Sequence, residues 1–420
     1  ANLRSRVSTT LEAAILVGPT RDDVRVELAR ALAVRLELAE RMHNRELAGE
    51  LANRIRTLVA AGAAPASLGM EHSLLTLVGL DLRTTVTLAR QRTEPSGLIV
   101  EEAATPITEG SHDLAPGSYM VQIVLADKPA VRLPVWLHRG QRETVQLPRV
   151  PTSIPDGMIF IPAGQTQVGA DEENMRVGLD MPPLHPVQVD AFLIGRFEVT
   201  MGQYAEWLDT LDAAERAARL PLNRSQPGAI ELRSSASGWT LQLRPTTIEY
   251  VVRWGEPLRY RGRSAHAVQD WRRLPVTGIS FDDATAFAAW LARGRLRGAR
   301  LCSELEWTRA ARGADDRVFT IGRRLLPGDA NFDLTYGGTD VAFGPDEVGS
   351  HPKSASMFGV EDLHGNAEEI VRATRWGEAT AVYGGSWYHE RVQQRLDNRF
   401  RNVPSTRHML MGFRVCSPVP

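Results

Sequence analysis

The stretch Phe358-Gly-Val-Glu-Asp-Leu-His-Gly-Asn-Ala-Glu-Glu-Ile370 decides the fold of this 420-residue chain. Gly365 lies inside it and allows a backbone turn that a residue with a side chain adopts less readily. Such a turn brings backbone carbonyls and the carboxylates of Asp362 and Glu369 toward one point. Oxygen ligands clustered in this way suit a hard cation such as calcium.

Two later stretches extend the pattern, Tyr383-Gly-Gly-Ser-Trp387 and Gly412-Phe-Arg-Val-Cys416. The glycine pair of the first predicts a strand that passes close to a bulky neighbour. Together with Gly365-Asn-Ala-Glu-Glu-Ile370, these stretches resemble the ordered signature G-N-x-W-E-W, G-G-S-W and G-F-R of the formylglycine-generating enzyme (sulfatase-modifying factor) family. The resemblance implies an α+β domain with a variant of the C-type lectin fold.

The resemblance covers roughly residues 155–418. Earlier stretches match the family in order, and they are Gly157-Met-Ile-Phe-Ile-Pro-Ala-Gly164, Phe197-Glu-Val-Thr200, Leu274-Pro-Val-Thr-Gly-Ile-Ser280 and Ala299-Arg-Leu-Cys-Ser-Glu-Leu-Glu-Trp307. The number of ordered matches makes the fold prediction specific. The function is a separate question, because one fold supports many functions.

The composition is that of an ordinary globular chain, with 43% hydrophobic residues, 24% charged residues and a formal net charge of -1. A net charge near zero gives no global field that would favour nucleic acid or a membrane surface. No apolar run approaches the roughly 18 residues needed to span a bilayer, and the first residues lack the apolar segment of a signal peptide. We therefore expect a cytoplasmic protein without a nucleic-acid partner or a membrane span.

The two cysteines, Cys302 and Cys416, exclude a disulfide scaffold and a multi-cysteine zinc site. They could pair, because both neighbouring strands are expected in the sheet near the chain end. Disulfides are rare in the reducing cytoplasm, however, so two separate buried thiols are the favoured interpretation.

Residues 1–66 are predicted to be a helical segment. Apolar residues recur at helical spacing in two stripes, which consist of Leu28, Leu32 and Leu36 and of Leu47, Leu51, Ile55 and Val59. His43-Asn44 between them marks either a turn or a kink. Such a short segment cannot bury its own stripes, so we expect it to belong to a larger protein.

Residues 69–148 are predicted to form a small antiparallel β-sandwich, because short strands alternate with Gly, Pro and Asp turn signals. Leu114-Ala-Pro-Gly-Ser-Tyr119 is similar to part of the surface-associated β-domains named for a Pro-Glu-Gly-Ala motif. Arg149-Val-Pro-Thr-Ser-Ile-Pro155 is typical of a stiff linker.

Three capping boxes predict three helices in the last domain, and they begin at Thr200-Met-Gly-Gln203, Ser280-Phe-Asp-Asp283 and Ser303-Glu-Leu-Glu306. Residues 220–272 form an insertion with a predicted strand at Gly238-Trp-Thr-Leu-Gln-Leu243. This order of parts is similar to the C-terminal part of some large bacterial serine/threonine kinases, although the sequence contains no kinase motif.

The resemblance implies where chemistry would lie. In the family, two cysteines hold the copper that oxidises a substrate cysteine, because soft thiolates select Cu(I). The first position is occupied here by His389, and the second by Arg391 or Gln394, depending on the direction of counting. We therefore expect no copper, no formylglycine-generating activity and a chain that is not an enzyme. The iron site of sulfoxide-synthase relatives needs several helical ligands, whereas residues 1–66 contain only His43.

Structural calcium is expected instead. By resemblance, one site maps to the side chains of Asn331 and Asp340 and the carbonyls of Phe332 and Ala342. The other maps to Asp362, the carbonyls of Gly365 and Ala367, and Glu369. Calcium prefers this mixture of oxygens, although Asn and Asp also bond their own backbone in turns without an ion. Glu368 and Ile370 replace the family's two tryptophans and leave the ligands in place.

We expect a non-catalytic recognition module that binds a protein, peptide or small ligand within a larger bacterial signalling or effector protein. One alternative is a display protein diversified by a retroelement, with residues 388–411 as its variable segment. Another is an oxidoreductase with an altered active site that uses His389.

The predicted ligand surface follows the glycine pair and consists of Trp387, Tyr388, His389, Arg391, Arg395 and Asn398. Trp, Tyr and Arg often dominate binding energy, because each buries a large area and keeps a polar group. Tyr388, His389 and Arg391 are expected to be exposed contacts. Trp387 and Arg395 fit a core position equally well.

Overall fold

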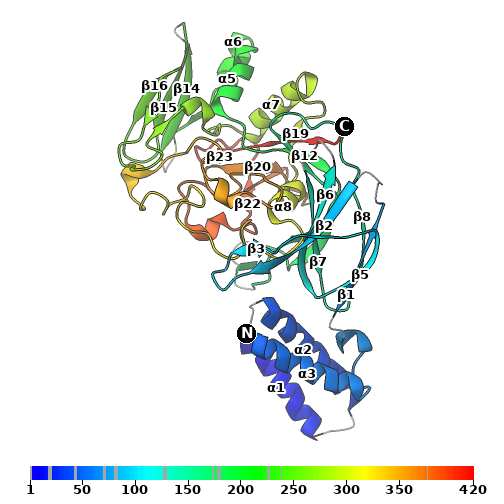
Figure 1. The fold of residues 1–420 in the computed structure, drawn as a ribbon. Coiled ribbons are helices and arrows are strands. Elements are labelled where there is room, and N and C mark those ends of the chain that lie inside the picture. The colour runs from blue at the N-terminus through cyan, green and yellow to red at the C-terminus, as the bar shows by residue number, and fades with distance from the viewer. Residues whose placement is uncertain are drawn as a thin grey trace. The chain divides into compact units, whose positions relative to one another are not determined.

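The computed structural model describes residues 2–17, 21–41, 45–69, 72–79, 84–125, 130–172, 175–176, 181–224, 228–236, 238–375 and 377–420. The chain divides into two compact units (Figure 1). The first contains residues 1–130 and 134–148, and the second contains residues 131–133 and 149–420. The expected α+β class is confirmed, and each unit is described by itself below.

The first unit begins with α1 (Asn2–Val17), α2 (Asp22–Arg41) and α3 (Arg45–Ala60), followed by the short 3₁₀ helix η1 (Ala66–Gly69). The predicted stripes are largely confirmed, because Leu28, Leu32, Leu36, Leu51 and Ile55 are buried together. The His43-Asn44 position lies outside the described residues. Helix α1 lies inside the predicted helical segment 1–66, although no apolar stripe was assigned to it. Its contact with α2 includes a polar residue: the guanidinium of Arg35 donates to the buried hydroxyl of Ser8 at 2.6 Å.

The strands between residues 73 and 146 are β1 (Ser73–Val78), β2 (Thr84–Thr93), β3 (Ile99–Glu101), β4 (Thr105–Pro106), β5 (Gly110–Leu114), β6 (Gly117–Leu125), β7 (Val131–Leu137) and β8 (Arg142–Gln146). They form a sheet of order β5-β1-β8 and a sheet of order β3-β2-β6-β7, with β4 paired to β2. The expected sandwich was antiparallel, but β1 and β8 are parallel. A parallel pair needs a long crossover, and here the other strands of the unit supply it.

The second unit opens with β9 (Met158–Ile161), β10 (Gly164–Val168), β11 (His185–Val189) and β12 (Phe192–Gly195), then α5 (Met201–Asp209) and α6 (Ala213–Arg219). The insertion folds mainly as a sheet of order β13-β14-β15-β16, made of Leu222–Asn223, Ala229–Ser235, Gly238–Arg244 and Tyr250–Arg253. These strands lie next to α5 and α6 (Figure 1), and their buried residues share one core with α5. The strand predicted at 238–243 is therefore confirmed.

The remainder of the second unit holds β17 (Leu258–Arg259), β18 (Val268–Gln269), η2 (Trp271–Arg273), α7 (Phe281–Arg293), β19 (Arg300–Leu301), α8 (Glu304–Arg312), η3 (Asp340–Ala342), η4 (Pro352–Ser354), β20 (Glu368–Arg372), β21 (Thr380–Tyr383), η5 (Arg391–Gln394), β22 (Phe400–Asn402), β23 (Met411–Gly412) and β24 (Val415–Pro418). Two sheets organise it, of order β19-β24-β12-β9 and β22-β21-β20-β23.

All three predicted capping boxes are confirmed at the starts of α5, α7 and α8. In each, the N-cap hydroxyl accepts from the third backbone N–H, and the third side chain accepts from the N-cap N–H. Helix α6 was missed, although Asp212 caps it by accepting from two backbone N–H groups.

The expectation of two separate thiols is wrong, because Cys302 and Cys416 form a disulfide. Strand β19 pairs with β24, and this pairing brings the two cysteines to a Cα–Cα distance of 4.9 Å. The expectation rested on a reducing compartment, so the disulfide weakens the argument for a cytoplasmic location. Within the described residues, no helix has the length and apolar character required to cross a bilayer.

Candidate functional site

An ion pair between Glu369 and Arg414 lies at the centre of the second unit. Both side chains are essentially inaccessible to solvent, and the guanidinium binds both carboxylate oxygens at 2.5 Å. The indole of Trp307 donates to the same carboxylate at 2.9 Å. Arg414 also donates to the carbonyls of Gly195 and Glu361. These bonds join β20, α8, β12 and the residues before β24, so the separate sequence motifs meet at one charge pair.

Glu369 was expected to be a ligand in the second calcium set, but its carboxylate already pairs with Arg414. Its carboxylate already has three charge-assisted or indole bonds and is neutralised by Arg414. Gly365 adopts a φ of +72°, and a Cβ there would lie 2.0 Å from the carbonyl oxygen of Asn331, so only glycine fits. Asp362 is buried, has a φ of +56° and accepts from the Gly349 N–H at 2.6 Å. Ala367 is buried beside them.

Glu198 is a further buried carboxylate near this set, and the sequence analysis did not assign it a role. Neither of its oxygens has a hydrogen-bond partner within the described residues. Burial, and then the charge of Asp362, raises the pKa of Glu198 well above its ordinary value. Burial likewise raises the pKa of Asp362 to about 6. Three carboxylates thus share one guanidinium, although the described residues contain no cluster of three or more acidic, histidine or cysteine side chains arranged to bind a metal.

The first expected calcium set is arranged differently. The amide nitrogen of Asn331 donates to the Gly344 carbonyl at 3.0 Å. The carbonyl of Ala342 accepts from the guanidinium of Arg263 at 2.6 Å. Phe332 is buried in a small apolar cluster, whereas Asp340 is exposed. One expected ligand therefore faces solvent, and another binds an arginine.

The predicted ligand surface is only partly at the surface. Tyr388 is 40% exposed, Arg391 is exposed, and the His389 side chain is 21% exposed. Trp387 is 1% exposed and belongs to the main hydrophobic core.

Of two further residues of the predicted surface, Asn398 is interior and Arg395 is half-buried. Arg395 binds both oxygens of Asp397 at 2.8 Å. Asn398 is buried and donates to the Gln393 carbonyl. The prediction of ligand contacts at Trp387, Arg395 and Asn398 is therefore corrected to positions that support the segment from within.

Several buried polar atoms around this segment lack a hydrogen-bond partner within the described residues. They are Trp387 Nε1, Gln393 Oε1, Gln394 Oε1, Asn398 Oδ1 and Asp333 Oδ1. Asp333 belongs to the same place, because its backbone N–H donates to the His389 carbonyl. An unsatisfied buried polar group costs about 1–3 kcal/mol, so a concentration of five requires a physical reason.

His389 lies beside two groups that can exchange protons with it. Its Nδ1 is 3.0 Å from the Ser386 hydroxyl oxygen and 3.6 Å from a carboxylate oxygen of Glu368. Burial raises the pKa of Glu368 to about 8, and burial lowers the pKa of His389 to about 4. Between these values both groups are neutral, so a neutral acid faces a neutral base. The sequence signal was the glutamate in place of a family tryptophan, which was noted without a role.

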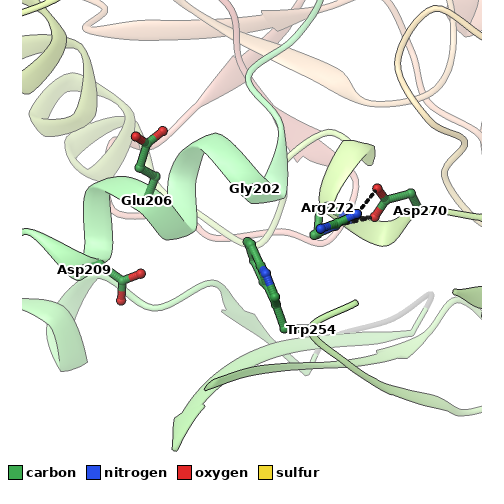
Figure 2. Close-up of a pocket in the computed structure, with 6 residues that line it drawn as sticks. All are labelled: Gly202, Glu206, Asp209, Trp254, Asp270 and Arg272. Atoms are coloured by element: carbon green, nitrogen blue, oxygen red, sulfur yellow. Dashed lines mark hydrogen bonds and ion pairs between the residues drawn. The ribbon is translucent and has the colours of Figure 1, made fainter. Parts of the chain in front are cut away.

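Figure 2 shows a separate hollow of about 430 Å³ beside α5, lined by Gly202, Glu206, Asp209, Trp254, Asp270 and Arg272. Its charged groups have protein partners: Glu206 pairs with Arg295, Asp209 accepts from the Trp239 indole, and Asp270 pairs with Arg272. The side chain of Trp254 is 42% exposed, so a ligand in the hollow could contact its ring. The hollow therefore carries less ligand-directed chemistry than the segment around His389.

In comparisons with known proteins, residues 144–418 match the sulfatase-modifying factor enzyme 1-like domain. The inactive C-alpha-formylglycine-generating enzyme 2 of Mus musculus is 25% identical over 62% of this chain and 85% of its own length. The hercynine oxygenase of Mycobacterium tuberculosis is 28% identical over 59% of this chain and 58% of its own length. The formylglycine-generating enzyme of the same organism is 27% identical over 50% of this chain and 72% of its own length.

Among solved structures, PvdO from Pseudomonas aeruginosa is 24% identical with a TM-score of 0.46, and the match covers 64% of this chain and 100% of that chain.

The expectation that the chain is not an enzyme is contradicted by these relatives, because most of them are named for an enzymatic activity and the family is enzymatic. That expectation rested on the missing copper cysteines and on the missing helical iron ligands. Their absence affects two reactions, whereas a single fold supports several chemistries.

Replacing Glu368 with Gln should change how stability depends on pH. The raised pKa means that the stability contribution of Glu368 is fully present below about pH 4.5 and is lost as the pH rises through about 8. Relative to Glu368→Gln, the free energy of unfolding of the original chain should fall by roughly 1.4 kcal/mol per pH unit across that window. Urea denaturation at several pH values measures this difference. Exposed Glu390→Gln is the control, and parallel curves for Glu368→Gln and the original chain would refute the assignment.

Proposed function

Because this chain belongs to the sulfatase-modifying factor enzyme 1-like domain family, we propose that its last domain binds a protein or peptide segment at the 386–398 face. This face is defined as residues 386–398 together with the adjoining residues 333 and 334. The observation that carries the proposal is that large apolar side chains and a cationic side chain are exposed together on this face. The unpartnered polar atoms beneath them have almost no accessible surface, so they are not themselves contacts for a bound segment.

The exposed side chains of the face support the same function. Leu334, Tyr388 and Val392 are large apolar residues with about two fifths of their surface exposed. Arg391 adds a positive charge beside them, and its guanidinium lies over the Phe332 ring at 5.9 Å. Aromatic, aliphatic and cationic side chains thus surround polar groups that are largely buried. This composition is typical of the core of a protein interface.

Proton transfer on the bound segment is a second candidate function, favoured by the neutral pair of Glu368 and His389. The imidazole Nε2 of His389 has no protein partner within the described residues. When the Nδ1–H donates to the Ser386 hydroxyl oxygen, Nε2 is the basic nitrogen open to a ligand, and Glu368 remains a separate protonated acid beside the ring. The copper chemistry of the family does not fit these residues, because both cysteines of the chain are joined in the disulfide. We therefore derive no step that uses copper.

The binding proposal predicts that the triple variant Tyr388→Ala, His389→Ala, Arg391→Ala loses affinity for peptides selected from a random library on the original chain. The expected loss is about 1–4 kcal/mol, since removing exposed contacts weakens binding but leaves the buried framework intact. Fluorescence anisotropy measures affinity, and thermal unfolding checks the fold.

The matched control is Val251→Ala, Trp254→Ala, Val268→Ala, which truncates three exposed apolar residues of the insertion. Unchanged affinity in the first triple variant and a loss in the control would place the ligand surface on the insertion.

We also propose that one calcium ion binds near Asp362, with Glu198 as its second carboxylate in place of Glu369. The unpartnered oxygens of Glu198 support this, because a buried carboxylate without a donor needs a cation or a proton. Glu369 is already neutralised by Arg414. The carbonyls of Gly365 and Ala367 are the backbone ligands that the family resemblance provides.

The calcium proposal predicts that calcium raises the melting temperature of the chelated chain, because an ion that binds only the native state stabilises it. Glu198→Gln should abolish this increase. It should also stabilise the chelated protein near pH 7.5, because burying an acid whose pKa is raised costs the original chain stability at that pH. Exposed Glu215→Gln serves as the control. A calcium response that survives Glu198→Gln would remove Glu198 from the site.

A further inference from the structure

Arg263 is a fully buried cation that the insertion delivers to residues 342–346. Its Nε donates to the Ala342 carbonyl and one terminal nitrogen donates to the Gly344 carbonyl, both at 2.6 Å. The other terminal nitrogen binds the carboxylate of Asp346 at 2.5 Å. Each of these three bonds joins a guanidinium N–H to an oxygen atom. The oxygen atoms therefore form a site that suits a cation.

Two aromatic rings close this site from either side. The guanidinium carbon lies 3.7 Å from the ring centre of Tyr260 and 4.0 Å from that of Tyr336. Both rings attract a cation through their faces. The Tyr336 hydroxyl also donates to Asp346 at 2.6 Å. Gly344 has no room for a side chain, because a Cβ would lie 2.6 Å from the Tyr260 ring. The site is thus built from both the insertion and the 331–346 segment.

The same segment contains the first expected calcium set. Ala342, whose carbonyl that set assigns to calcium, accepts from Arg263 instead. The Asn331 amide donates to the Gly344 carbonyl, to which Arg263 also donates. Asp340, the expected carboxylate ligand, is exposed, whereas Asp346 binds the arginine. A divalent ion at Ala342 would lie beside a buried guanidinium and would be repelled by it.

We propose that Arg263 takes the place of a metal ion in this segment and thereby positions the floor of the 386–398 face. Ala342 and Gly344, the two carbonyls held by Arg263, flank Phe343. The Phe343 ring contacts Tyr388 at a centroid distance of 5.6 Å and Trp387 at 6.1 Å. Arg263 is therefore a positioning residue that acts through Phe343, and this second part of the inference rests on the proposed binding function.

Calcium counting by equilibrium dialysis tests the first part on the full chain. Asp340→Ala should bind the same number of calcium ions as the original chain and show the same calcium-dependent change in melting temperature. A lower count in Asp340→Ala would overturn the proposal, because it would place an ion in the segment that Arg263 occupies. This variant changes an exposed side chain, so loss of folding does not confuse the result.

Thermal unfolding and peptide affinity test the positioning role. Arg263→Gln should lower the melting temperature by about 6–12 °C, because it removes the guanidinium from buried Asp346 and leaves His351 as its ion-pair partner, whereas exposed Arg261→Gln should not. At a temperature where Arg263→Gln is folded, its affinity for the selected peptides should fall at least about fivefold, and Arg263→Lys should recover part of it. Unchanged affinity in Arg263→Gln would refute the positioning role. If the original chain selects no peptides, the binding function fails while the calcium count still decides the first part.

Discussion

The buried pair of Glu369 and Arg414 is the interaction on which the second unit depends. It connects strand β20 of one sheet to the residue just before strand β24 of another, and it adds Trp307 from helix α8. Removing one partner of such a pair typically costs about 3–5 kcal/mol, because the other charge stays buried. The glutamate of the Gly365 stretch and the arginine of the Gly412 stretch are therefore needed together.

Buried arginines serve the same purpose elsewhere in this unit. Arg309 donates to the Gln165 carbonyl, and Arg312 donates to the carbonyls of Gln167 and Gly169. Arg263 does so in the 342–346 segment. A guanidinium presents five donors in one plane, so it can gather carbonyls that would otherwise need a metal ion or water.

Local sequence signals predicted the parts of the structure that local interactions control. The capping boxes at Thr200, Ser280 and Ser303 determine where three helices begin, and each involves only four consecutive residues. The ordered motifs predicted the fold class, because each motif packs against a particular other motif in the folded domain. Helix α1 lies within the predicted helical segment, but it received no apolar stripe because part of its contact is polar.

The site could be predicted less well, because it depends on contacts between distant residues. Nothing near Glu369 in sequence reveals that Arg414 neutralises it, and nothing near Ala342 reveals Arg263. Trp387 was assigned to a surface on residue type, whereas its exposure depends on the core that surrounds it. The pairing of Cys302 with Cys416 depends on strand register across 114 residues, which a compartment argument cannot supply. Glu368 was visible as an unusual residue, but its position 3.6 Å from His389 could be found only in the structure.

A double-mutant cycle at Glu369 and Arg414, measured by equilibrium urea denaturation, tests the central claim most directly. We predict that Glu369→Gln and Arg414→Gln each lower the free energy of unfolding by about 3–5 kcal/mol. The double variant should lose at least about 2 kcal/mol less than the sum of the two, because the pair acts as one unit. Effects that add to within about 0.5 kcal/mol would contradict the account and would show that Glu369 and Arg414 stabilise the fold through separate partners.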